Sequence, residues 1–134
     1  MAELADNVRQ YLEEVRLAVF GSTNRDGTPH LTGLWYELRD DHIILNTGVG
    51  TRKVRNLERD PRASVCVIDH GAARHVTVNG TVTLDEEHVL EDLTRLASRY
   101  AGSEAGPRIA GNIARIPHVT LKLSIDRVHT FGKI

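Results

Sequence analysis

The sequence predicts an antiparallel β-barrel with short helices packed at its ends. Five to seven short segments have the alternating or continuous apolar character of strands, and most are joined by turns of hairpin length. Only two segments show clear helical periodicity. Parallel strands need long crossover connections, so these short turns favour an antiparallel barrel over a doubly wound sheet. The 134 residues are expected to form one domain, 1–134.

The first half of the chain predicts a helix and then three strands. Apolar residues in 3–14 recur at helical spacing, which indicates a short amphipathic helix. An Asp26-Gly27 pair marks a hairpin turn, and RDDH marks a second turn. The three strands around these turns are expected to form a meander, and they cover 16–23, 30–38 and 42–47.

The second half predicts two further helices and three further strands. A helix over Thr51–Arg59 should stop at Asp60-Pro61, because proline cannot donate a helical hydrogen bond. Asp85 is the expected cap of a later helix, and Gly80 indicates a bulge or a close backbone approach within a strand. The remaining elements are strands at 63–69, 75–84 and 118–131, a helix at 85–100, and an irregular segment at 101–117 with one helical turn. The continuous apolar run of 63–69 predicts a strand covered on both faces.

Composition excludes several function classes. Seventeen basic residues against eighteen acidic ones give a net charge of −1, which argues against a protein that coats nucleic acid or an anionic membrane. No run of about 18 apolar residues and no signal-peptide pattern occurs, so a cytoplasmic protein is expected. The single cysteine, Cys66, rules out an internal disulfide and is expected to be a buried apolar residue. The seven histidines lack zinc-site spacing, so no metal site is expected.

The segment Asn46–Asn56, NTGVGTRKVRN, indicates an anion-binding site. Gly48 and Gly50 leave the backbone amides unobstructed, and the following helix start presents unpaired N–H groups. Arg52 and Lys53 add full positive charges. The alternative is a solvated helix end whose cations pair with nearby acids such as Glu58 or Asp60. The segment is not a P-loop, because a valine follows the lysine where a Ser or Thr is required.

The order of these parts resembles the FMN-binding split β-barrel superfamily, which includes pyridoxamine 5′-phosphate oxidase and the deazaflavin (coenzyme F420) dependent reductases. The resemblance is strongest over residues 10–84. Its most specific piece, RKVRNLERDPRAS, is similar to the small actinobacterial-type F420 proteins. The resemblance implies a six-stranded antiparallel split β-barrel of Greek-key topology. It also implies a homodimer with two cofactor sites along the subunit interface.

The resemblance further implies which residues meet the cofactor. The residues expected at its phosphate-bearing tail are Thr47, Gly48, Gly50, Thr51, Arg52, Lys53 and Asn56, with Arg55 a weaker candidate. The residues expected beside its ring are Pro29, His30, Thr32, Gly33 and Leu34. Trp35 is expected to pack at the dimer interface, with cofactor or substrate contact as the alternative. No catalytic acid is evident; His30 or a water is the candidate proton donor.

The function implied is that of an F420H2-dependent reductase. It would pass a hydride to a small electron-poor organic acceptor of biliverdin, quinone or enone type. One alternative is an FMN-dependent oxidoreductase of the pyridoxamine phosphate oxidase type, whose R-x-H pattern is matched only in its letters by Arg127–His129. Another is a non-enzymatic carrier of a flavin, a deazaflavin or haem. The C-terminal VHTFGKI segment, with His129, Phe131 and Lys133, is a further candidate contact with the partner's site.

Overall fold

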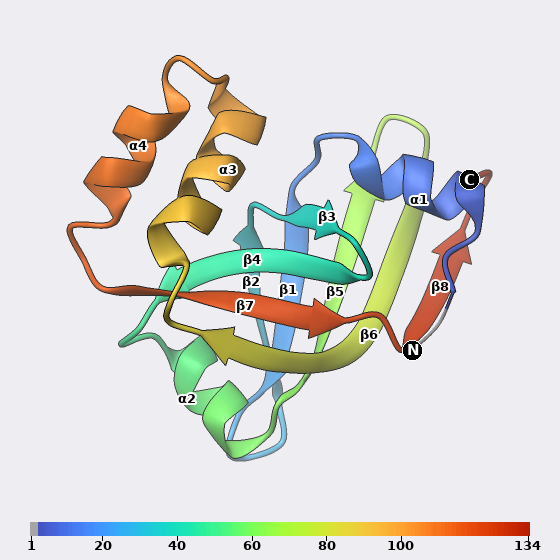
Figure 1. Ribbon diagram of the computed structural model, residues 1–134. Helices are drawn as coiled ribbons and strands as arrows, with labels where there is room; N and C mark the ends of the chain where they lie inside the picture. The colour runs from blue at the N-terminus through green and yellow to red at the C-terminus, as the bar shows by residue number, and fades with distance from the viewer. Residues whose placement is uncertain (1–2) are drawn as a thin grey trace.

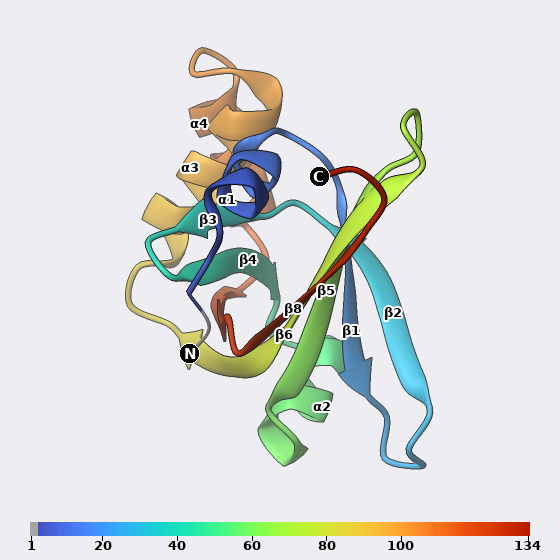
Figure 2. The same ribbon diagram turned by 90° about the vertical axis from the view of Figure 1, so that its right-hand side faces the viewer.

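The computed structural model describes residues 3–134 and shows two crossing β-layers with helices around them (Figure 1). Its strands are β1 Ala18–Thr23, β2 Pro29–Leu34, β3 Glu37–Arg39, β4 His42–Gly48, β5 Arg62–Asp69, β6 Arg74–Asp85, β7 His118–Ser124 and β8 Arg127–Phe131. Its helices are α1 Asp6–Glu13, α2 Arg52–Arg59, α3 Val89–Ala101 and α4 Gly106–Ile113. The helices α1 and α2 lie at opposite ends of the barrel, and α3 and α4 form a pair on one side (Figures 1 and 2).

The strand order confirms the predicted antiparallel split β-barrel. Hydrogen-bonded neighbours follow the order β2-β1-β5-β6-β7-β4-β3, every pair is antiparallel, and β8 adds to β6. In Figure 1, β4 and β7 cross in front of the upright β1 and β5. Strand β6 joins the two layers, because it pairs with β5 and β8 over its first part and with β7 over its last four residues.

Gly80 is the point at which β6 changes partners. A Cβ atom at this position would lie 1.7 Å from the carbonyl oxygen of Ser124, so no other residue fits without moving the backbone. The close approach expected from the sequence is therefore present. It allows β6 to bend from one layer into the other.

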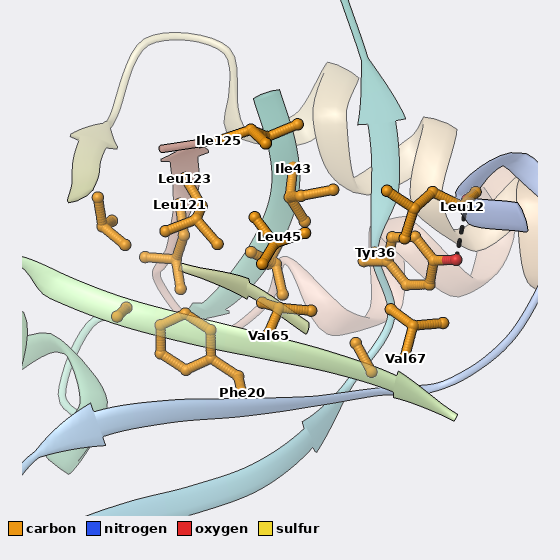
Figure 3. Close-up of a cluster of buried hydrophobic side chains, with 14 of the residues drawn as sticks. Leu12, Phe20, Tyr36, Ile43, Leu45, Val65, Val67, Leu121, Leu123 and Ile125 are labelled. Carbon is orange, nitrogen blue, oxygen red and sulfur yellow. Dashed lines mark hydrogen bonds between the residues drawn. The ribbon is translucent and has the colours of Figure 1, made fainter. Parts of the chain in front are cut away.

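The core lies between the two layers and is filled by alternate residues of the strands (Figure 3). Its largest fully buried side chains include Leu12, Phe20, Tyr36, Ile43, Leu45, Leu121, Leu123 and Ile125. Burying a side chain of this kind stabilises the fold by roughly 1.5–3 kcal/mol. The hydroxyl of Tyr36 donates to the carbonyl of Leu12 at 2.8 Å, which fixes the end of α1 against the core (Figure 3). Burial raises the pKa of Tyr36.

Two predicted strands are each broken into two, which changes the pairing. The strand expected over 30–38 ends at Leu34 and resumes at Glu37, because Tyr36 turns into the core and its N–H is bonded by the Tyr100 hydroxyl at 3.0 Å. Both hairpins of the predicted meander form, β1 with β2 and β3 with β4, but β2 and β3 lie at opposite ends of the strand order, so the meander is not continuous. The strand expected over 118–131 is interrupted at Ile125, which is buried. These breaks account for eight strands in the described residues where six were expected.

The region after β6 also departs from the prediction. Strand β6 continues to Asp85 and α3 begins at Val89, so Asp85 is not the helix cap. Instead, the Asp85 carboxylate accepts the N–H of Glu87 at 2.8 Å and pairs with Lys122 at 3.1 Å. The segment expected to be irregular forms α4. A Cβ at Gly106 would lie 2.5 Å from the Cα of Ser98, so this glycine lets α3 and α4 pack closely.

A buried polar network fixes α3 to the sheets. Asp92 on α3 is 3% exposed and accepts hydrogen bonds from Arg39 at 2.7 Å and Thr120 at 2.8 Å. Arg39 also bonds Glu37 at 2.6 Å, and the hydrogen bonds from Arg39 and Arg95 lower the pKa of Glu37 against the opposing effect of burial. Because strands β3 and β7 each supply a partner, the helix is held in one position over β4.

Candidate functional site

The loop from β4 to α2 exposes unpaired backbone donors. The Thr51 hydroxyl donates to the Gly48 carbonyl at 2.9 Å, and the amide of Val49 is bonded by the Pro117 carbonyl at 2.9 Å. The first α-helical bond of α2 is made by the amide of Arg55 to the Thr51 carbonyl. Across residues 3–134, the amides of 52–54 have no backbone acceptor. Three N–H groups therefore point out of the helix start, where the helix dipole favours an anion.

Lys53 is the least expected feature of this loop. It is only 9% exposed, and no residue of 3–134 offers it a hydrogen bond or a carboxylate partner. Burial alone lowers the pKa of the Lys53 amine. It shares the buried face of α2 with Asn56 and Leu57, three and four residues further on. A cation held in this way is poised to be neutralised by an anion from outside the chain.

The two acids expected to neutralise the loop, Glu58 and Asp60, make no ion pair with its cations. Asp60 pairs with Arg62 at 2.8 Å, and the hydrogen bonds from Arg62 lower the pKa of Asp60 to about 2. Glu58 makes no ion pair with any described residue. The alternative of a helix end whose cations are paired with Glu58 or Asp60 is therefore not what the structure contains.

Other predicted tail residues have structural roles. The side-chain amide of Asn56 donates to Ser22 at 3.1 Å and to Asn24 at 3.0 Å, so it ties α2 to the end of β1. Arg55 donates to the Gly50 carbonyl at 3.0 Å and stabilises the loop. Thr47 is 5% exposed and lies within β4. Arg52 is exposed and lines a broad polar groove of about 900 Å³ between α2 and the β1–β2 turn, together with Arg25, Arg55 and Arg59.

A smaller cavity of about 260 Å³ lies between the sheets and the α3–α4 pair. Its walls are mainly apolar. Leu34 at the end of β2 and the following Trp35 form one side, and Leu93 and Leu96 of α3 with Ile113 of α4 form the other. Trp35 stacks on Tyr100 of α3, with ring centroids 5.1 Å apart and planes 10° apart. Trp35 thus has a packing partner within its own chain and also faces the cavity.

Two polar side chains, Asn46 and His118, complete the cavity wall. The amide nitrogen and oxygen of Asn46 are both shielded from water and have no hydrogen-bond partner in the described chain. Leaving such a group unpaired costs roughly 1–3 kcal/mol. The Nδ1 atom of His118 lies 2.6 Å from the Ile116 carbonyl, which can only accept, so Nδ1 carries a hydrogen and Nε2 is an acceptor in the neutral ring.

The cavity adjoins the β4–α2 loop. His118 lies directly opposite Gly48 in the β4–β7 ladder, and Asn46 precedes Gly48 by two residues on the same face of β4. Two residues of strand span about 7 Å. A ring in the cavity and a charged tail at the loop can therefore belong to one molecule.

The structure divides the residues expected beside the ring. Gly33 and Leu34 line the cavity, whereas Pro29, His30 and Thr32 do not. The Thr32 hydroxyl is buried without a partner in the described chain, and His30 lies opposite Ser22 in the hairpin. His118, and not His30, lines this cavity.

Sequence reasoning missed Asn46, His118 and the helical wall. No periodicity marked Asn46, which shares a face of β4 with His42 and Ile44. No periodicity marked His118. Among residues 3–134, no three His, Cys, Asp or Glu side chains gather as a metal site would require, and no helix is long and apolar enough to cross a bilayer.

Comparison with known proteins identifies the family. Residues 4–132 match the family model described as pyridoxamine 5′-phosphate oxidase. The chain belongs to the pyridoxamine 5′-phosphate oxidase family. Members of this family are split-barrel oxidoreductases that bind FMN or related flavins.

Individual relatives show how far the likeness extends. The pyridoxine/pyridoxamine 5′-phosphate oxidase of Acidothermus cellulolyticus is 33% identical over 103 residues, which is 77% of this chain and 45% of the relative, so the chain spans less than half of that protein. The crystal structure of a conserved hypothetical protein of Mycobacterium tuberculosis, Rv2991, has a TM-score of 0.79 and 26% identity, covering 98% of this chain and 86% of the other. An F420 reductase structure has a TM-score of 0.80 and 19% identity, covering 94% and 98% of the two chains, and it shares the fold.

Proposed function

We propose that this protein is an F420-dependent reductase that binds the cofactor phosphate at the β4–α2 loop and its ring along β2 and β4. When bound, the reduced deazaflavin supplies a hydride to an electron-poor organic acceptor. The protein supplies orientation and a water-poor cavity, both of which favour the transfer.

The observation that supports this proposal most is the unpartnered Lys53. The residue is mostly buried at the start of α2, where the amides of 52–54 have no backbone acceptor, and no carboxylate of the described chain pairs with it. A phosphate would accept hydrogen bonds from the amides and restore a charge partner to the lysine. Gly48, Gly50 and Thr51 shape the loop, while Arg52 offers a second cation at its rim. These residues fit a phosphorylated cofactor.

The choice of F420 over FMN rests on the helix sequence. RKVRNLERDPRAS, which forms α2 and its exit, resembles the small F420 proteins more specifically than the oxidases. The groove beside α2 is lined by four arginines and by two acids, Asp26 and Glu58, and this excess of positive charge suits an anionic tail. A small electron-poor molecule would then approach the ring through the α3–α4 cavity.

The proposal includes a homodimer. The outer face of β2, β1, β5, β6 and β8 is not covered by any described element, and it carries exposed Leu31, Ile68 and Phe131. The sequence of β5 predicted burial on both faces, and a second copy of the chain would provide the missing cover.

Cofactor titration of Lys53→Ala tests the phosphate role. A charge-assisted hydrogen bond contributes about 1.5–3 kcal/mol, so the variant should bind F420 roughly ten- to a hundred-fold more weakly than the wild type. Fluorescence titration measures the affinity, and circular dichroism checks that the fold is intact. Lys122→Ala is the matched control, since Lys122 lies on β7 and pairs with Asp85. Equal affinity of Lys53→Ala and wild type would reject the proposal.

An FMN-dependent oxidoreductase is the second candidate, favoured by the identity of 33% to a pyridoxine/pyridoxamine 5′-phosphate oxidase. The same titrations with FMN decide between the two. FMN binding at least tenfold tighter than F420 binding would favour the oxidase type. Cofactor binding without turnover of any acceptor under reducing conditions would favour the carrier.

A further inference from the structure

We propose that the cavity between β4 and the α3–α4 pair recognises a cyclic amide edge, an adjacent N–H and C=O, on a planar ligand of one or two rings. The inference deepens the proposed function, on which it rests for the role of the site. It assigns to that site a ligand chemistry and a recognition residue, Asn46.

Asn46 defines the polar part of the ligand. Its side chain has an NH2 group that donates and a carbonyl oxygen that accepts. Both are shielded from water and have no partner in the described chain. A cyclic amide or imide satisfies both atoms at once, because its N–H and C=O lie side by side. A quinone or a simple enone has only carbonyl oxygens and would leave the Asn46 oxygen unpaired.

The walls define the rest of the ligand. Leu34 and Trp35 close the cavity on one side, and Leu93, Leu96 and Ile113 close it from the helices. Trp35 is held by stacking on Tyr100, so its indole is a fixed apolar surface. A cavity of 150 Å³ accepts benzene, so about 260 Å³ suits a ring or a fused pair of rings.

Position links this cavity to the anion loop. Asn46 and Gly48 are on one face of β4, and His118 is the ladder partner of Gly48. The cyclic amide edge could therefore come from the pyrimidine end of a ring cofactor whose tail reaches the loop. It could equally come from an acceptor that carries a lactam. The two sources share the chemistry that Asn46 recognises.

Binding of two small ligands tests the inference without catalysis. Lumazine, a fluorescent bicyclic imide with no tail, is titrated beside 1,3-dimethyllumazine, in which methyl groups replace both ring N–H groups. Wild-type protein should bind lumazine at least tenfold more tightly than the methylated ligand. Asn46→Leu should bind the two ligands equally. The matched control Asn112→Leu lies on the exposed side of α4 and should keep the tenfold difference.

Three results would overturn the inference: no lumazine binding up to about 1 mM, equal wild-type affinity for both ligands, or a tenfold difference that survives in Asn46→Leu. Competition then identifies the source of the edge. If F420 or FMN displaces lumazine, the cyclic amide edge belongs to the cofactor ring. If lumazine still binds to cofactor-saturated protein, the edge belongs to the acceptor.

A negative result for the cavity can be distinguished from a negative result for the proposed phosphate site. Lumazine has no phosphate, so Lys53→Ala should bind it with wild-type affinity even where that variant loses F420. Loss of lumazine discrimination in Asn46→Leu together with unchanged F420 affinity in Lys53→Ala would support the cavity and reject the phosphate site. The reverse pair of results would reject only the cavity.

Discussion

Lys53 holds a positive charge where burial works against it. Desolvation lowers its pKa in the folded protein below the ordinary value of 10.5, so the unfolded chain binds this proton more tightly than the folded chain does. The sign follows directly: the free energy of unfolding should rise as pH increases from the lowered pKa toward 10.5. Below that window the charged lysine disfavours the folded state.

Urea unfolding between pH 8 and 10.5 measures this effect. Relative to Lys53→Met, which has no charge to bury, the wild type should gain stability as the pH rises. Bound phosphate removes the difference by giving the cation a partner, and cofactor affinity should decline as Lys53 loses its proton. Lys53→Arg stays charged and should keep its affinity over the same range. Parallel stability curves for wild type and Lys53→Met would contradict the argument.

Helix α3 depends on one buried acid. Asp92 is bonded by Arg39, whose side chain is a quarter exposed, and by Thr120. Removing one member of a buried pair costs about 3–5 kcal/mol of unfolding free energy. Because Arg39 is partly exposed, we expect Arg39→Leu to lose about 3 kcal/mol. Adding Asp92→Asn to this variant removes the unpaired charge and keeps an acceptor for Thr120. The double variant should therefore regain about 1 kcal/mol or more of unfolding free energy relative to Arg39→Leu.

Chemical denaturation of the single and double variants checks this prediction. Arg62→Leu breaks an ion pair in which Arg62 is 81% exposed, and it should change the unfolding free energy by less than about 1 kcal/mol. A double variant no more stable than Arg39→Leu would show that the unpaired charge is not the cause.

The bend of β6 depends on Gly80. Gly80→Ala places a methyl group against the Ser124 carbonyl and forces the β6–β7 crossing apart, so we expect a loss of roughly 2–3 kcal/mol in thermal or urea unfolding. Gly33→Ala is the control, because a Cβ there meets no atom within 4 Å. A loss at Gly80 no larger than at Gly33 would mean that the strand relaxes without cost.

The elements that sequence predicts well are those decided by their own residues. Proline after Asp60 ends α2, and alternation defines β6 and β7. The breaks were not predictable, because Tyr36 leaves its strand to bond Leu12 and Tyr100, which are distant in the chain. The glycines and cations of the β4–α2 loop were visible in one segment of the sequence. The cavity was not, since Asn46, His118 and α3 meet only through the fold.

At the scale of the whole molecule, the covered and uncovered faces of the sheet predict association. Leu31 is 62% exposed, Ile68 45% and Phe131 60%, and ladder pairing places them on one face. Leu31→Glu puts a charge into that face and should convert a dimer of twice 14.9 kDa into a monomer. Light scattering after gel filtration measures the mass.

Leu90→Glu provides the matched control for this experiment. Leu90 is 56% exposed but lies on α3, outside the proposed interface, so its variant should keep the wild-type mass. If wild-type protein is monomeric at all concentrations tested, or if both variants behave alike, the uncovered face does not carry the dimer.

The α3–α4 pair enters the chain between β6 and β7, two strands that are ladder partners from Asp85 and Thr120 onward. The segment that carries α3 and α4 thus leaves and rejoins the barrel at neighbouring points, while the β4–α2 loop belongs to a different connection. The helical wall of the cavity and the β4–α2 loop are consequently encoded in separate stretches of the gene. Descendants of a common ancestor can diversify the first by insertion or recombination and inherit the second unaltered.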